Sequence, residues 1–106
     1  MIKIINCTPH AINITDGPTF KPSGTVTRVD TIQSDAGSIN DIPVKTQTFG
    51  DIIDLPEPQD DTVFIVSAIV LAAAKEKGRT DVVAPDTSNA VRNDQGHIVS
   101  VPGFIK

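Results

Sequence analysis

The segment Thr62–Thr87, TVFIVSAIVLAAAKEKGRTDVVAPDT, constrains the fold of this chain most, because it has the pattern of a strand, a helix and a strand in unbroken succession. Thr62–Val66 is β-branched and aromatic, which favours a strand, and Val82–Ala84 predicts a second one. Ala68–Lys77 between them is rich in helix formers. Such a unit is normally a right-handed crossover that joins parallel strands.

The expected helix has clear ends and an unusual surface. Ser67 stands at the N-cap position and Gly78 at the position after the C-cap. The helix is apolar almost all round from Ile69 to Ala74, so we expect it to be buried between the sheet and a second layer, with a partner subunit as one candidate for that layer.

The N-terminal half has the pattern of short strands separated by turns. Strands are expected, in chain order, at Ile2–Asn6, Ala11–Ile14, Thr25–Ile32 and Ile42–Phe49. The last two are expected to pair, with Ser34–Asn40 as an exposed loop between them and Gly50 as the end of the second.

The other segments complete a one-domain prediction. Asp54–Asp61 contains two prolines and four acids and is expected to cross the surface as an extended strap. Ala90–Arg92 and His97–Val101 flank a hairpin loop at Asn93–Gly96. The prediction is an α+β or small α/β domain over residues 1–106, a mixed sheet of short strands whose strand–helix–strand crossover unit packs a single buried helix.

Composition excludes several classes of function. The net charge of −4 and the pI of 4.8 argue against binding of duplex nucleic acid, since Lys75, Lys77 and Arg79 are the only basic grouping and suit the end of a helix. The apolar run Val63–Ala74 is too short to span a membrane. The single Cys7 and the lack of a secretory signal indicate a cytoplasmic protein. No zinc spacing, calcium loop or phosphate loop occurs, so no metal and no cofactor is expected.

A candidate site follows from the rule that parallel sheets bind ligands beyond the carboxyl ends of their strands. If Ile2–Asn6 joins the same sheet in parallel, these ends supply an amide, hydroxyls, an imidazole and a carboxylate, on Asn6, Thr8, His10, Ser67, Asp86 and Thr87. Arg79 and Arg92 are the cations that would hold an anion there.

Each candidate also has a purely structural interpretation. Ser67 is an N-cap, Asp86 with Thr87 forms a turn, and His10 is a loop residue. Arg79 pairs with Asp81 or with the last carbonyls of the helix, and Arg92 pairs across its hairpin. His97, beside the hairpin loop, is expected to face solvent, and Cys7 to be buried and inert.

The chain also resembles a known family over nearly its whole length. The matching segments are Asn6–His10, Pro22–Val26, Phe49–Gly50, Leu55–Pro58, Ile65–Ser67 and Asp81–Thr87. This order is similar to a family of small uncharacterised proteins of bacteriophages and bacterial mobile elements. The resemblance implies a cytosolic accessory protein of a phage, a prophage or its host, and it assigns no activity to particular residues.

Three functions are open at this point. A binding module for a polar or anionic small molecule, or for a host protein, fits best. A structural or assembly protein would form a homo-oligomer through the apolar helix or a free strand edge. A small hydrolase would use His10 with Ser67 or Asp86, which would have to lie within about 3 Å of each other or of a shared water.

Overall fold

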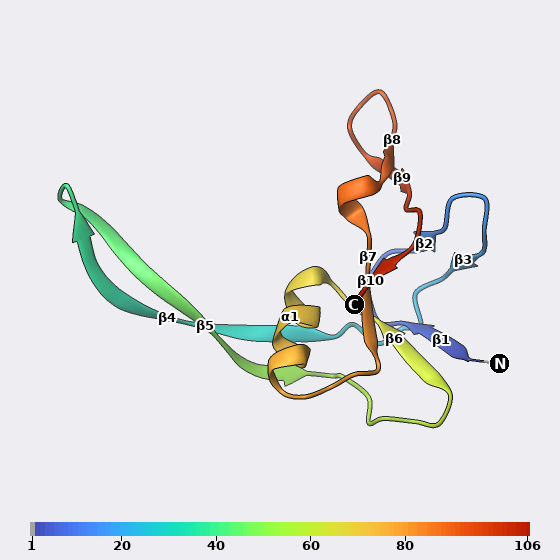
Figure 1. The fold of residues 1–106 in the computed structure, drawn as a ribbon, viewed down its shortest axis with the longest axis horizontal. Helices are drawn as coiled ribbons and strands as arrows, with labels where there is room; N and C mark the ends of the chain where they lie inside the picture. Colours follow the sequence, from blue (N-terminus) through green and yellow to red (C-terminus); the bar gives the residue numbers. More distant parts are fainter. Residues whose placement is uncertain (1) are drawn as a thin grey trace.

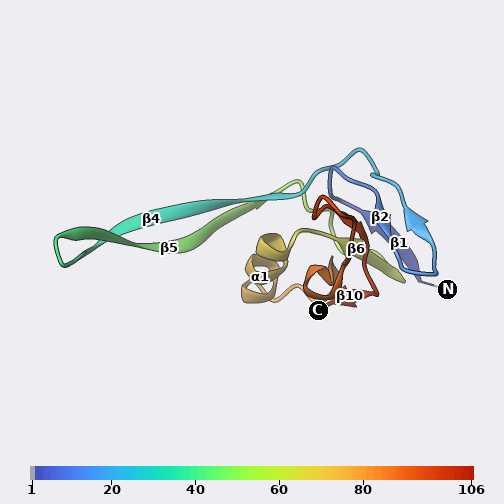
Figure 2. The same cartoon turned by 90° about the horizontal axis from the view of Figure 1, so that it is seen from above.

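The computed structural model describes residues 2–106, which form a small body with a long two-stranded arm projecting from it (Figures 1 and 2). Its class is the sheet-rich α+β fold that the sequence predicts, with a single α-helix in the described part of the chain. The elements, in order, are β1 (Lys3–Asn6), β2 (Ile12–Asn13), β3 (Thr19–Phe20), β4 (Arg28–Ile39), β5 (Ile42–Ile53), β6 (Thr62–Ile65), α1 (Ala68–Glu76), β7 (Val82–Pro85), a 3₁₀ helix (Thr87–Asn89), β8 (Val91–Arg92), β9 (Ile98–Ser100) and β10 (Phe104–Ile105).

The central sheet has the strand order β1-β6-β7-β10. β1 and β7 both pair in parallel with β6, and α1 is the connection between β6 and β7. β10 is the outermost strand beside β7 and pairs with it in the antiparallel direction, with Phe104 opposite Pro85. The carboxyl ends of β1, β6 and β7 therefore lie at the same edge of the sheet, which is where parallel strands place binding residues.

The core lies between this sheet and α1. Its buried residues, from β6, α1, β7 and the end of β1, are Cys7, Phe64, Val66, Val70, Leu71, Ala74, Val82 and Ala84. The base of the arm is the second layer over the helix, because Val29 of β4 and Ile52 of β5 pack against the same cluster. One side of the helix stays uncovered, with Ala68 and Ala72 exposed and Ile69 45% exposed, so the helix is not buried all round. The cover that the apolar helix requires thus comes largely from this chain itself.

Both predicted ends of the helix are confirmed. Ser67 has the extended backbone of an N-cap, and its Oγ accepts a hydrogen bond from the Val70 N–H at 3.4 Å. Gly78 follows the C-cap with φ +83°, a left-handed conformation that costs a residue without a Cβ nothing.

The prediction of an exposed loop at Ser34–Asn40 is wrong. β4 continues to Ile39, and the chain reverses only at Asn40 and Asp41, whose φ angles are 50° and 64°. Asn and Asp tolerate this left-handed conformation, and two such residues in succession make the tight turn that matches the twist of a hairpin. The composition of this segment is typical of a loop, but its polar residues are the exposed residues of a strand.

Gly50 does not end the strand, which runs to Ile53. It lies at an irregularity in the pairing, opposite Asp30, where the two strands approach closely. A Cβ added at Gly50 would lie 3.3 Å from the Asp30 carbonyl oxygen. The glycine therefore permits a bulge and is not a strand terminator.

The smaller elements agree with the sequence in part. β8 and β9 form the expected hairpin, and Asp54–Asp61 contains no helix or strand. β3 pairs with β2, and neither β3 nor β10 is predicted from the sequence. Across residues 2–106, no helix combines the length and the apolar character that crossing a membrane requires.

Candidate functional site

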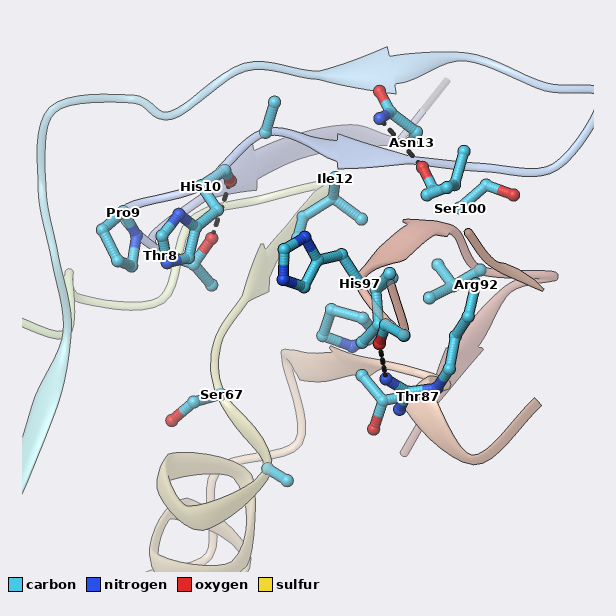
Figure 3. Close-up of a pocket in the computed structure, with 17 residues that line it drawn as sticks. Thr8, Pro9, His10, Ile12, Asn13, Ser67, Thr87, Arg92, His97 and Ser100 are labelled. Carbon is cyan, nitrogen blue, oxygen red and sulfur yellow. Dashed lines mark hydrogen bonds between the residues drawn. The ribbon is translucent and has the colours of Figure 1, made fainter. Parts of the chain in front are cut away.

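A cleft of about 1050 Å³ lies at the edge of the sheet where β1, β6 and β7 end (Figure 3). The loop after β1 and strand β2 form one wall, the start of α1 and the end of β7 form the floor, and the β8–β9 hairpin forms the other wall. The residues that line it are Thr8, Pro9, His10, Ala11, Ile12, Asn13, Ser67, Ala68, Pro85, Thr87, Arg92, Gly96, His97, Ile98, Val99, Ser100 and Val101.

Asn6 shapes the first wall from beneath. Its side chain is buried, and its Nδ2 donates to the carbonyl oxygens of His10 at 2.7 Å and Phe20 at 2.9 Å. Its Oδ1 accepts from the backbone N–H of Thr8 at 2.9 Å and lies 2.7 Å from the Thr8 hydroxyl. Both donors and both lone pairs of the amide are therefore used inside the protein. Asn6 positions Thr8 and His10 and has no group left for a ligand.

The floor of the cleft contains the N-terminus of α1. Ser67 and Ala68 line it, and the first turn of the helix contains no acidic residue. The first amides of a helix have no partner within the helix, and the helix dipole is positive there. The Ser67 side chain caps one of these amides, so the capping role expected from the sequence is present.

Asp86 and Thr87 are neighbours in the chain but differ in their relation to the cleft. Thr87 lines the cleft, whereas Asp86 is not among the lining residues. The Asp86 carboxylate accepts a hydrogen bond from Asn89 Nδ2 at 3.0 Å, and its backbone N–H donates to the Gly103 carbonyl. Asp86 therefore stands at the start of the 3₁₀ helix, and the partner of its carboxylate is a side chain of that helix.

The second wall depends on the hairpin loop. Asn93 Oδ1 accepts from the backbone N–H groups of Gln95 and His97, both at 3.0 Å, and Gly96 has φ +81°. Arg92 Nη1 donates to the Gly96 carbonyl at 2.8 Å. This is the one of its five guanidinium donors that bonds within residues 2–106, and Arg92 lines the cleft.

His97 is exposed, as expected, but it also belongs to the cleft. Its ring reaches from the β8–β9 hairpin toward the loop that carries His10 (Figure 3). Two imidazoles from opposite ends of the chain, those of His10 and His97, therefore line one cavity. Local sequence patterns place His97 beside a turn, but they give no sign of what the turn folds over.

Arg79 lies away from the cleft, at the amino end of β7. Its Nε and Nη2 donate to both carboxylate oxygens of Asp81, at 2.8 and 2.9 Å, and Nη2 also donates to the Pro56 carbonyl at 2.8 Å. The hydrogen bonds and charge of Arg79 hold the pKa of Asp81 below its ordinary value, and the same contacts raise the pKa of Arg79. This side chain fastens the strap to the body.

The lining that sequence reasoning missed comes from long-range pairing. Val101 N–H donates to the Asn13 carbonyl at 2.9 Å, Thr15 N–H donates to the Val101 carbonyl at 2.8 Å, and Asn13 Nδ2 donates to the Val99 carbonyl at 3.2 Å. These bonds bring Ile12 and Asn13 beside β9 and the residue that follows it. Local sequence patterns do not predict a contact between segments so far apart in the chain.

The cleft differs in charge from the rest of the molecule. The chain has 13 acidic and 9 basic residues, yet the side chains that line the cleft, all within residues 2–106, include Arg92 and two histidines and no Asp, Glu or Lys. Hydroxyls stand at Thr8, Ser67, Thr87 and Ser100, and the remaining wall is largely aliphatic.

Groups suited to covalent or metal chemistry are not brought together. Among the described residues no hydrogen bond joins His10 to Ser67 or Asp86, and no three His, Cys, Asp or Glu side chains form a group that could hold a metal ion. Cys7 is 1% exposed, and burial raises the pKa of its thiol.

Comparison with protein-family models, with curated proteins and with solved structures finds no match to this chain.

Proposed function

We propose that the protein is a binding module whose cleft takes a small organic anion. The observation that carries this proposal is the lining of one cavity, where Arg92 is the charged side chain, the imidazoles of His10 and His97 stand beside it and no carboxylate occurs, in a chain whose net charge is −4. Such a local reversal of charge concentrates anions at the cavity.

The shape and chemistry of the lining favour an anion with an apolar body. Ile12, Pro85 and Ile98 contribute aliphatic surface, while Arg92 offers planar donors that suit phosphate or carboxylate oxygens. Binding pockets commonly combine an apolar lining with a few placed polar groups. Nucleoside phosphates and other phosphorylated or carboxylated small molecules have this character.

The proposal treats β6, α1 and β7 as one crossover unit. In that arrangement the end of β6 delivers the amide groups of the helix N-terminus, and the end of β7 delivers Pro85 and Thr87. The helix dipole then adds to the attraction that Arg92 exerts on an anion.

Binding accounts for this geometry better than hydrolysis does. A hydrolase would need His10 within about 3 Å of Ser67 or Asp86 or of a shared water, and the hydrogen bonds that Ser67 and Asp86 make go to Val70 and Asn89. The resemblance to proteins of phages and mobile elements supports a cytoplasmic accessory role, with a host metabolite or the acidic surface of a host protein as the ligand.

The proposal is tested by thermal shift and calorimetry with nucleoside phosphates, sugar phosphates and small carboxylates. A ligand present at about 100 times its Kd adds about 2.7 kcal/mol of stability, which the melting temperature reports. Arg92→Gln removes the charge in the cleft, and Arg28→Gln removes the same charge from an exposed position at the base of the arm. We expect Arg92→Gln to weaken binding about tenfold or more, as loss of a charge-assisted hydrogen bond does, and Arg28→Gln to leave it unchanged.

Two results would overturn the proposal. One is the absence of any shift across the panel at millimolar ligand. The other is a ligand whose affinity falls equally in both arginine variants, because binding would then depend on overall charge and not on the cleft.

A further inference from the structure

Several polar side chains that line the cleft are already hydrogen-bonded inside the protein. Those with a partner within 3.4 Å are Thr8, Asn13, Ser67 and Ser100. By contrast, no hydrogen bond within residues 2–106 involves the imidazole of His10, the imidazole of His97 or the hydroxyl of Thr87. The lining groups whose hydrogen-bonding capacity the fold leaves unused therefore include both imidazoles.

The two imidazoles are held at the cleft by hydrogen bonds of their own backbone. The His10 carbonyl accepts from Asn6 Nδ2 at 2.7 Å. The His97 N–H donates to Asn93 Oδ1 at 3.0 Å, and its carbonyl accepts from the Asn93 N–H at 2.9 Å. In Figure 3 the ring of His97 lies between His10 on one side and Arg92 on the other. The chain has two histidines, so all of its histidine stands at one cavity.

Within residues 2–106, the elements around the two imidazoles bring no carboxylate into the lining. Arg92 is the charged side chain there, and the first turn of α1 contains no acidic residue. Asp86 accepts instead from Asn89 Nδ2 at 3.0 Å, and burial raises the pKa of the Cys7 thiol. The titratable side chains of the neighbouring strand ends and turns, none of which lines the cleft, are Cys7, Asp16, Lys21, Asp86, Asp94 and Lys106. A bound anion would therefore be the negative partner that both rings lack.

The two imidazoles couple the binding of an anion to the binding of protons. An anion beside an imidazole favours the protonated ring, because opposite charges attract. Histidine is the side chain that ordinarily titrates between about pH 5 and pH 8. A cleft that holds an anion beside two imidazoles therefore takes up protons as it binds, and by linkage its affinity falls as the pH rises.

The charge that the lining can reach favours a ligand group with two negative charges. Arg92 alone balances one negative charge, and protons on His10 and His97 match a second. We propose that the ligand carries a doubly charged oxyanion, a phosphate monoester on an organic body, and that the cleft binds it together with protons on His10 and His97. This inference rests on the proposed function and adds the charge of the ligand and the pH response of the site.

Isothermal titration calorimetry at constant ionic strength tests the proton coupling. Phenyl sulfate is the probe, because it carries one negative charge throughout the range in which histidine titrates. Both rings are exposed to solvent, which screens their charges, so we expect the wild type to bind it about tenfold more tightly at about pH 5.5 than at about pH 8. The double variant His10→Gln/His97→Gln keeps Arg92 and is expected to bind it equally at both pH values. Circular dichroism melting confirms that the variant is folded.

Phenyl phosphate tests the charge of the ligand on the same apolar body. At about pH 7.5 it is almost fully doubly charged. The wild type is expected to bind it about tenfold more tightly than phenyl sulfate and to take up protons, which titrations in two buffers of different ionisation enthalpy measure. In the double variant, the proton uptake and most of this preference are expected to be lost. A readout without any variant is the pair of imidazole signals in NMR spectra of the wild type, which should move toward the protonated form when phenyl phosphate is added.

Failure of this inference is distinguishable from failure of the proposed function. Equal affinity for phenyl sulfate at both pH values, an unchanged pH response in the double variant, or equal affinity for the two phenyl esters overturns the inference, while ligand binding and its loss in Arg92→Gln would stand. Absence of binding of either ester at every pH overturns the inference and, together with no shift across the wider panel, the proposed function as well.

Discussion

Asn6 illustrates how one residue can matter to a site without touching its ligand. Its position at the end of β1 predicts that its amide binds a ligand. In the structure, every donor and acceptor of that amide is hydrogen-bonded to Thr8, His10 or Phe20. The residue that faces the cleft is His10, whose backbone Asn6 fixes. A sequence can show that a polar residue stands at a strand end, but it cannot show whether the chain folds back to satisfy that residue.

Asn6→Asp tests this positioning role. The carboxylate would keep the acceptor and lose both donors, and it would face the carbonyl oxygens of His10 and Phe20 in a buried place. Leaving such groups unpaired costs about 1–3 kcal/mol each, so we expect the free energy of unfolding in urea to fall by about 2 kcal/mol or more. Asn40→Asp at the exposed tip of the arm is the control and is expected to be neutral. Equal losses in the two variants would contradict the positioning role.

At the scale of elements, prediction from sequence succeeds where the signal is local. Ser67, the helix formers after it and Gly78 define α1 almost to the residue, because capping and helix propensity act within one or two turns. It fails at Ser34–Asn40 and Gly50, where the same residue types serve an exposed strand and a bulge. β3 and β10 are two residues long and owe their pairing to partners elsewhere. The strand ends place Thr8, Ser67 and Thr87 at one end of the sheet, whereas the walls from β2, β8 and β9 depend on tertiary contact.

The pair Arg79 and Asp81 joins the strap, the loop after α1 and the start of β7, and it gives stability a defined pH dependence. Because the native pKa of Asp81 is lowered, the stabilisation is complete above the unfolded pKa and is lost as the pH falls through the native pKa. We expect Asp81→Asn to cost about 1–2 kcal/mol at neutral pH, since hydrogen bonds to charged groups are lost in a partly exposed site. Urea unfolding should show this difference unchanged from pH 8 to pH 5 and shrinking below about pH 4. Asp94→Asn, in the exposed hairpin loop, is the control, and a difference that does not change with pH would contradict the assignment.

The whole molecule divides into a body that contains the core and an arm that contributes only its base to it. The radius of gyration is 16.3 Å, above the roughly 13 Å of a compact chain of this length. None of the buried core residues lies between Ile32 and Thr48. The body therefore contains what is needed to fold and to form the cleft.

Replacing Ile32–Thr48 with Asn-Gly tests this division. Thr31 and Phe49 lie opposite each other, so a two-residue turn can join them. We expect the shortened protein to unfold cooperatively with nearly the same urea midpoint, and small-angle scattering to give a radius of gyration of about 13 Å. Loss of cooperative unfolding would show that the outer arm supports the body.

The parallel pairing of β1 with β6 also orders events in time. Lys3 pairs with Thr62 and Asn6 with Ile65, so the first strand must wait for the middle of the chain to be synthesised. The two strands of the arm are consecutive and can close within about 1–10 μs once both exist, whereas a ribosome adds only about 5–20 residues per second. On a nascent chain, the arm can therefore form before the sheet.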